Sequence, residues 1–210
     1  MEIHTFELGS FAVSAYVVVA DGEAMVIDAP EGAGRIVEFC ESRGLAPRML
    51  VNTHAHVDHI FANAMLKKKW PLMAIAIGKE DAAMAVRPSR NLSMLLGKWI
   101  KSPKPDRLLE AGDRVEIGRA VFEVLATPGH TRGGISLFAR EGPDGKPVVF
   151  AGDALFAGGI GRTDFPGGNT ETLLTSIRER LLTLPPETVV YPGHGPASTI
   201  GQEARTNPFL

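Results

Sequence analysis

A run of four potential metal ligands is the feature that most constrains this chain. The sequence HAHVDH begins at position 54, one residue after the segment 48–52, for which we predict a strand. His54 and His56 are two residues apart, so both side chains point to the same side of an extended segment. A predicted helix then begins, and its first turn directs Asp58 and His59 back toward the same point. The run therefore predicts a ligand cluster at a strand-to-helix turn.

Three later turns each add one further ligand, and in each turn the ligand directly follows a glycine. These ligands are His130, Asp153 and His194. Each follows the end of a predicted strand, and glycine lets the backbone turn sharply and approach a neighbour closely. Because sheets of α/β proteins collect ligands where strands end in loops, we expect all four segments to meet at one sheet edge.

The chemistry of these seven side chains favours divalent metal ions. Imidazole nitrogens and carboxylate oxygens suit zinc, iron, manganese or cobalt better than Cu(I) or an iron–sulfur cluster. Seven ligands are too many for one tetrahedral ion and fit two ions that share a carboxylate. We therefore predict two divalent ions per chain, with zinc favoured and iron or manganese as alternatives. A closed structural zinc site is disfavoured because it prefers cysteine, and Cys40 is the single cysteine.

The remaining pattern predicts an α/β fold in one domain over residues 1–210. Short apolar strands occur in both halves and alternate with helices, which indicates sheets covered by helices. The predicted helices span residues 34–43, 58–70 and 170–184, and a hairpin turn is expected at Asp21-Gly22. Residues 79–100 are expected to be helical in pieces, broken by Pro88 and Gly97. Cys40 lies on the apolar face of the first helix, so we interpret it as a core residue rather than a nucleophile.

Charge and hydropathy exclude several classes of partner. The chain has 22 Lys and Arg residues against 24 Asp and Glu, a net charge of −2. It therefore lacks the basic field that would favour nucleic acid or an anionic membrane. The apolar run Phe11–Ala20 is half the length that a bilayer requires, and acidic residues precede it where a signal peptide would be basic. We expect a cytoplasmic protein.

The ligand run, together with His130, Asp153 and His194, resembles the metallo-β-lactamase fold superfamily over residues from about 10 to 200. With aspartate at position 153, the ligand set resembles that of the hydroxyacylglutathione hydrolase (glyoxalase II) branch. The resemblance implies a four-layered αβ/βα sandwich, in which two mixed sheets are flanked by helices and the site lies at one edge of the sheets.

The resemblance also implies a role for each ligand. His54, His56 and His130 would hold the first metal, Asp58, His59 and His194 the second, and Asp153 would bridge both. It further implies hydrolysis of a small-molecule thioester such as S-2-hydroxyacylglutathione by a hydroxide between the ions, with Asp58 as the catalytic residue that orients it. A thiolate leaves readily, so no strong protein acid is required.

The segment Gly161–Phe165 resembles a stretch that lines the site in short glyoxalase II-like proteins and in persulfide dioxygenases. Two readings of Arg162 stay open: it binds a substrate carboxylate, or it forms an ion pair with Asp164. Longer glyoxalase II enzymes carry lysine at this position and end in a helical glutathione-binding region. Only residues 195–210 follow His194 here, so we expect this chain to lack that region.

Other activities of the same fold remain open at this point. A mononuclear iron persulfide dioxygenase would use one histidine of the ligand run with His130 and Asp153 on a single iron. Gly193-His194-Gly195-Pro196 resembles the hydrolase form, which favours hydrolysis. A nuclease is disfavoured by the neutral charge. A purely metal-binding role is disfavoured because a structural site does not need so many ligands.

Overall fold

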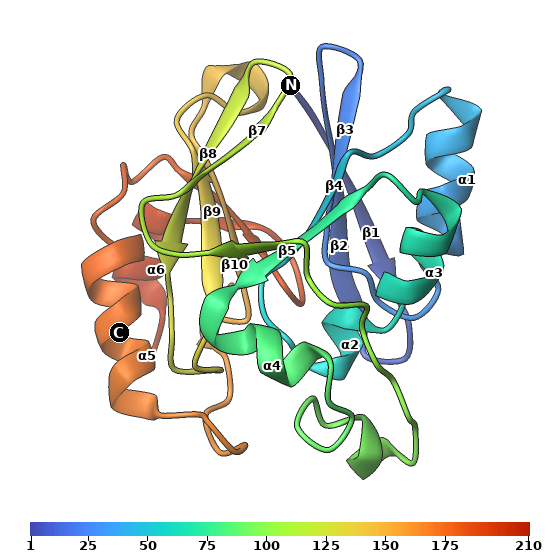
Figure 1. Ribbon diagram of the computed structural model, residues 1–210. Coiled ribbons are helices and arrows are strands. Elements are labelled where there is room, and N and C mark those ends of the chain that lie inside the picture. The colour runs from blue at the N-terminus through green and yellow to red at the C-terminus, as the bar shows by residue number, and fades with distance from the viewer.

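The computed structural model describes all residues from 1 to 210, and its main strands form two six-stranded sheets that face each other (Figure 1). The first sheet has the order β1 (Glu2–Leu8), β2 (Val13–Ala20), β3 (Glu23–Ile27), β4 (Met49–Asn52), β5 (Ala74–Gly78), β6 (Arg107–Leu109). Its first three strands are antiparallel, and β3 to β6 run parallel.

The second sheet is built from the other half of the chain. Its order is β14 (Ser198–Thr199), β13 (Val189–Pro192), β10 (Val148–Gly152), β9 (Ile135–Ala139), β8 (Ala120–Ala126), β7 (Arg114–Ile117). Only β10 and β13 pair in parallel. A separate ribbon of β11 (Leu155–Phe156) and β12 (Gly159–Ile160) follows β10. Both sheets are mixed, as the resemblance implied.

Helices cover the outer face of each sheet and complete the four layers (Figure 1). On the first sheet lie α1 (Gly34–Ser42) and α3 (Asn63–Lys69), and on the second lie α5 (Thr170–Ser176) and α6 (Ile200–Thr206). Two short helices, α2 (Val57–Ile60) and α4 (Ala82–Ala85), lie at the lower edge in this view. The αβ/βα sandwich is confirmed. None of the helices combines the length and apolar character that crossing a bilayer requires.

The largest apolar cluster fills the space between the two sheets. It contains 17 buried residues, with Met25 and Ile27 from one sheet facing Phe122 and Phe150 from the other. A second cluster joins the first sheet to α1, and Cys40 is fully buried in it. Burial raises the pKa of the Cys40 thiol to about 11, which removes the thiolate that a nucleophile needs. The prediction of a core cysteine is confirmed.

Two predicted helices differ from the observed ones. The helix expected over residues 58–70 divides into α2 and α3, because backbone groups of the loop after β3 form hydrogen bonds at the break. There, Ala29 N–H donates to the His59 carbonyl and Ala62 N–H to the Ala29 carbonyl, both at 2.8 Å. The helix expected over 170–184 is regular only to Ser176 and continues as a π-turn, Ile177–Leu181. The Asp21-Gly22 hairpin is confirmed, with φ of 51° and 81°.

Candidate metal centre

The turns after β4, β8, β10 and β13 meet at one edge of the sandwich, and all seven predicted ligands lie there. Their ligand atoms lie within 4.8 Å of one another in three overlapping groups: His54, His56 and His130; His54, His59 and Asp153; Asp58, His59 and His194. The expectation that four separate segments converge is confirmed.

The first group consists of three buried histidines. His56 Nδ1 lies 2.8 Å from His130 Nε2, and the ring centroid of His54 is 4.9 Å from that of His56 and 4.8 Å from that of His130. His54 Nε2 is buried and has no hydrogen-bond partner. An unpaired buried nitrogen is costly, and each such group in a native fold requires an explanation. A cation between the three rings would satisfy it.

The second group combines Asp58 with His59 and His194. His194 Nε2 lies 3.4 Å from His59 Nε2 and 3.5 Å from Asp58 Oδ2. His59 Nε2 lies 3.8 Å from the same carboxylate oxygen. Two imidazole nitrogens and one carboxylate oxygen therefore face a common point, which is a donor set suited to a divalent ion.

Asp153 lies between the two groups. Its Oδ2 is 3.5 Å from both His130 Nε2 and His194 Nε2, so it borders one histidine of each group. Its Oδ1 is 3.3 Å from His59 Nε2, is buried, and accepts no hydrogen bond of good geometry. This is the position that a carboxylate shared by two ions requires.

Four of the five histidines have their second ring nitrogen fixed by a hydrogen bond that leads away from the cluster. The pairs are His54 Nδ1 with Thr53 Oγ1 (3.1 Å), His59 Nδ1 with Asp28 Oδ2 (2.8 Å), His130 Nδ1 with the Arg162 carbonyl (2.6 Å), and His194 Nδ1 with the Phe11 carbonyl (2.9 Å). An acceptor at Nδ1 favours the tautomer in which Nε2 carries a lone pair. That lone pair points into the cluster.

Asp28, which the sequence pattern did not identify, holds the ligand run in place through hydrogen bonds. It is buried directly after β3, with a left-handed φ of 60°. Its carboxylate accepts the Thr53 N–H and hydroxyl and the His59 Nδ1–H, each at 2.8 Å. A carboxylate at the end of an apolar strand, on the same edge as the ligands, was the available signal.

Asp81, also missed, joins the first ligand turn to the second. This buried carboxylate accepts the N–H of Ala55 (2.9 Å), the Thr131 hydroxyl (2.8 Å) and the N–H of Gly133 (2.7 Å). Burial raises its pKa, and the three donors only partly offset that effect. The sequence reading assigned this region to broken helices and offered no signal for such a role.

The glycines that precede the ligands permit the close approach that the sequence predicted. A Cβ on Gly193 would lie 2.0 Å from Asp153 Oδ1, and a Cβ on Gly152 would lie 2.6 Å from the Thr53 side chain. Gly152 also has a φ of 51°. Any side chain at these positions would displace the carboxylate or the ligand turn.

The charges of the site favour cation binding. Burial raises the pKa of Asp153, but His59, His130 and His194 outweigh it and hold that pKa far below the usual range. For Asp58, too, burial raises the pKa, but the adjacent histidines outweigh it and leave a lower value. Both carboxylates are therefore anionic at neutral pH.

Among three buried histidines of the ligand run, the pKa shifts in opposite directions. Burial lowers the pKa of His54 well below its ordinary value and that of His56 to about 3, so both rings are neutral. Burial also disfavours the charged form of His59, but Asp153, Asp28 and Asp58 outweigh it and raise its pKa well above normal. Binding of a divalent ion would displace that proton, as metal binding to histidine generally does.

A cavity of about 420 Å³ opens from the cluster to the surface. Its polar lining consists of cluster residues and Arg162. The Arg162 guanidinium lies 3.9 Å from the Phe165 ring centroid and donates two hydrogen bonds of 2.7 Å to the Asp164 carboxylate. Of the two readings left open, the ion pair is formed here, and a contact with substrate stays a prediction.

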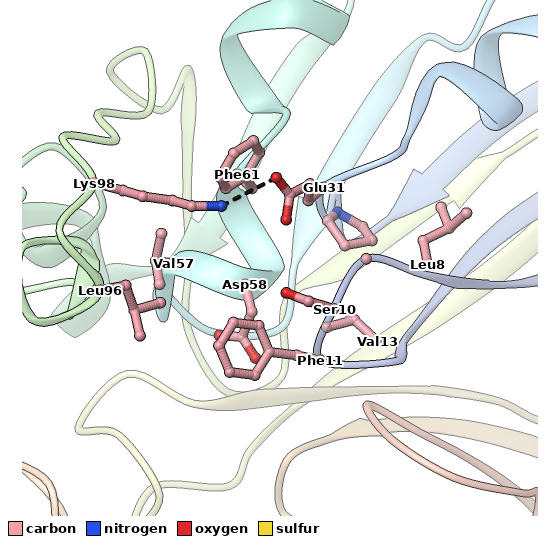
Figure 2. A pocket seen from close by; sticks show the side chains of 12 residues that line it. Leu8, Ser10, Phe11, Val13, Glu31, Val57, Asp58, Phe61, Leu96 and Lys98 are labelled. Carbon is pink, nitrogen blue, oxygen red and sulfur yellow. Dashed lines mark hydrogen bonds and ion pairs between the residues drawn. The ribbon is translucent and has the colours of Figure 1, made fainter.

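A second, much smaller pocket of about 20 Å³ lies beside the metal centre (Figure 2). Figure 2 shows Asp58 and Phe11 near one another and the Lys98–Glu31 ion pair, with its 3.0 Å contact, on the opposite side. Lys98 also lies 4.6 Å from the Phe61 ring centroid. Because this pocket is the size of a single water molecule, the larger cavity is the candidate substrate site.

Comparison with known proteins agrees with this description. Residues 8–194 match the family described as the Metallo-beta-lactamase superfamily. The chain is 38% identical over 211 residues to "Probable metallo-hydrolase YqgX" of Bacillus subtilis, covering 100% of this chain and 98% of that protein. It is also 38% identical over 188 residues to "Hydroxyacylglutathione hydrolase GloC" of Haemophilus influenzae, covering 89% of this chain and 87% of that one.

Two solved structures share the fold over nearly the whole chain. The BLEG-1 B3 metallo-beta-lactamase superposes with a TM-score of 0.92 at 35% identity, covering 100% of this chain and 99% of the other. TTHA1623 in a di-iron-bound form superposes with a TM-score of 0.87 at 38% identity, covering 99% of this chain and 100% of the other.

Proposed function

This protein belongs to the metallo-β-lactamase superfamily, and we propose that it is a dinuclear metallohydrolase that cleaves small-molecule thioesters, S-2-hydroxyacylglutathione among them. The observation that carries the proposal is the position of Asp153. Its carboxylate borders both groups of histidines, and one of its oxygens is buried without a hydrogen bond. The similarity to a hydroxyacylglutathione hydrolase supports the choice of substrate class.

The residues present fit two divalent ions. The first would be held by His54, His56 and His130, the second by Asp58, His59 and His194, and both by Asp153. The unpaired His54 Nε2 and Asp153 Oδ1, together with the fixed Nδ1 atoms, support this assignment. Zinc suits the nitrogen-rich set, and the di-iron form of a similar protein supports iron as the alternative.

Bound divalent ions supply a deprotonated water at neutral pH and polarise a carbonyl oxygen. The chain contributes Asp58, whose low pKa keeps it anionic and whose side chain lines the cavity. We assign to Asp58 the acceptance of a hydrogen bond from the attacking water, which orients it, in addition to a ligand role. The thiolate leaving group requires no protein acid, and no acid other than cluster residues lines the cavity.

Metal analysis combined with turnover tests this proposal. Purified protein should contain two metal ions per chain and hydrolyse S-lactoylglutathione, a 2-hydroxyacyl thioester. One iron per chain with oxygen consumption on a persulfide would identify the dioxygenase instead. A protein with two metals that cleaves a β-lactam but no thioester would contradict the proposed substrate class.

A further inference from the structure

An apolar rim surrounds the metal centre on the side of the cavity. We use this name for the apolar side chains that line the cavity outside the ligand turn: Phe11, Leu92, Leu95, Leu96, Phe156, Ile160 and Phe165. Several are exposed to an unusual degree, with 74% of Leu95 and 50% of Phe11 accessible. A contiguous exposed apolar surface around a cavity indicates a binding role rather than a packing role.

The leucines of the rim are held in this exposed arrangement by the fold. Leu92 has a left-handed φ of 70°, which is strained for a residue with a branched side chain. The adjacent buried Asn91 fixes the segment: its side chain donates to the Ile100 carbonyl (2.9 Å) and accepts the Ser93 N–H (3.0 Å). The backbone carbonyl of Asn91 also accepts the Val57 N–H at 2.9 Å, which connects the rim to the ligand run.

The rim lies close to both halves of the centre. The Phe165 ring centroid is 5.8 Å from that of His56, and the Phe156 ring centroid is 6.1 Å from that of His194. In a thioester, the carbonyl carbon is the atom attacked, so the acyl group must lie within a few ångströms of the cluster. An aromatic wall therefore contacts the acyl group in either orientation of the substrate.

The rim offers no partner to a polar acyl group. Every polar side chain that lines the cavity belongs to the cluster, except Arg162, which is paired with Asp164. A hydroxyl pressed against this wall would lose its hydrogen bonds to water without replacement. An aliphatic chain would instead gain from each methylene removed from water.

We infer that the apolar rim binds the acyl group of the substrate and favours an aliphatic chain of several carbons over a short hydroxyacyl group. The inference rests on the proposed thioester hydrolysis. It adds a specificity determinant, formed by the aromatic wall together with Leu92, Leu95 and Leu96, that the metal ligands do not supply.

Two thioesters of the same thiol test the inference. For each thioester, kcat/KM is divided by the rate of its uncatalysed hydrolysis. This ratio should be about tenfold or more higher for S-hexanoylglutathione than for S-lactoylglutathione. The substitution Leu95→Ser should lower this preference about fivefold, because a wall contact is lost. Leu72→Ser is the matched control, since Leu72 is 98% exposed and does not line the cavity. It should leave both rates unchanged.

Binding provides a readout that is independent of turnover. By titration calorimetry, S-hexylglutathione should bind about tenfold more tightly than S-methylglutathione, and Leu95→Ser should reduce that difference. If neither thioester is hydrolysed but the difference in affinity is seen, the proposed hydrolysis is contradicted and the inference that the rim binds an aliphatic chain is retained. If both thioesters are cleaved with equal efficiency and Leu95→Ser changes neither ratio, the inference is overturned and the function stands. A change of oligomeric mass on Leu95→Ser would also overturn it, by showing that the rim joins copies of the chain.

Discussion

The floor and the rim of the metal centre are built in opposite ways. The floor consists of Asp28, Asp81 and Thr53, which are buried, polar and joined to the ligand turns by hydrogen bonds. The rim is apolar, exposed at Leu95 and Phe11, and carries no hydrogen bond to a ligand side chain except through the Phe11 backbone. If the proposed function and the inference about the rim hold, the floor would fix the positions of the ligands and the rim would select the substrate.

The polar groups buried at the metal centre also lower the stability of the fold. Buried carboxylates and unpaired nitrogens destabilise a fold unless something compensates them. The unpaired atoms, His54 Nε2 and Asp153 Oδ1, both face the cluster rather than the floor. Cation binding should therefore stabilise the folded chain, because the native state offers the site preformed and the unfolded state does not.

The largest effect is expected from Asp153→Ala, which removes the carboxylate shared by the two groups. We expect loss of metal and a fall in kcat/KM of about a thousandfold or more, because the whole centre depends on this residue. Metal content by elemental analysis and turnover of a thioester measure the two effects together. A variant that retains both metals and full turnover would show that Asp153 bridges nothing.

A smaller loss is expected from Asp28→Asn, within the floor. An amide group cannot accept the Thr53 N–H, the Thr53 hydroxyl and the His59 Nδ1–H together as the carboxylate does. The metal affinity should fall about ten- to hundredfold, the usual effect of losing a partner that orients a histidine ligand. Competition with a chelator of known affinity measures it, and an unchanged affinity would contradict the orienting role.

The substitution Asp81→Asn should act on folding more than on metal. Asp81 contacts the backbone and a hydroxyl of the ligand turns but no ligand ring. Losing one of its acceptors leaves a buried donor unpaired, so the free energy of unfolding should fall by about 1–3 kcal/mol. Urea denaturation of the metal-free protein measures this change. A loss of metal affinity larger than that of Asp28→Asn would remove the distinction between the two carboxylates.

These two carboxylates also show where prediction from the sequence ends. The seven ligands were predictable because each follows the end of a strand, where the fold gathers its functional groups. The partners of Asp28 come together only when β3 and β4 pair within the first sheet. Those of Asp81, up to 52 positions away, come together only once the two sheets have packed. The break between α2 and α3 has the same origin, since Ala29 from a distant loop supplies the bonds that interrupt the helix.

The rim was the less predictable region for a related reason. The spacing of leucines such as Leu92, Leu95 and Leu96 is typical of the apolar face of a helix. The sequence predicted helical pieces over residues 79–100 but not which side chains they expose. The structure confirms the helical pieces, which are a 3₁₀ turn at Lys79–Asp81, α4, and a 3₁₀ turn at Ser93–Leu96. The last of these, which carries the rim leucines, lies between left-handed residues at Leu92 and Gly97. Local propensity does not foresee such a conformation, because the side chain of Asn91 and the ligand run hold it in place.

The smallest effects are expected at Arg162, where the rim meets the solvent. Its ion pair with Asp164 is exposed, and exposed pairs contribute only about 0–1 kcal/mol. A substrate carboxylate can therefore compete with Asp164 for the guanidinium at little cost. We expect Arg162→Ala to raise KM for an acidic thioester by about threefold and to leave a neutral thioester nearly unaffected.

The reciprocal substitution sharpens this last prediction. Asp164→Ala would free the guanidinium fork, which remains positioned by its contact with the Phe165 ring. KM for the acidic thioester should then fall, in the direction opposite to Arg162→Ala. Steady-state kinetics with the acidic and the neutral thioester decide between the two readings of Arg162. Equal changes for both substrates would mean that the pair only shapes the loop, and that the rim selects substrates by apolar contact alone.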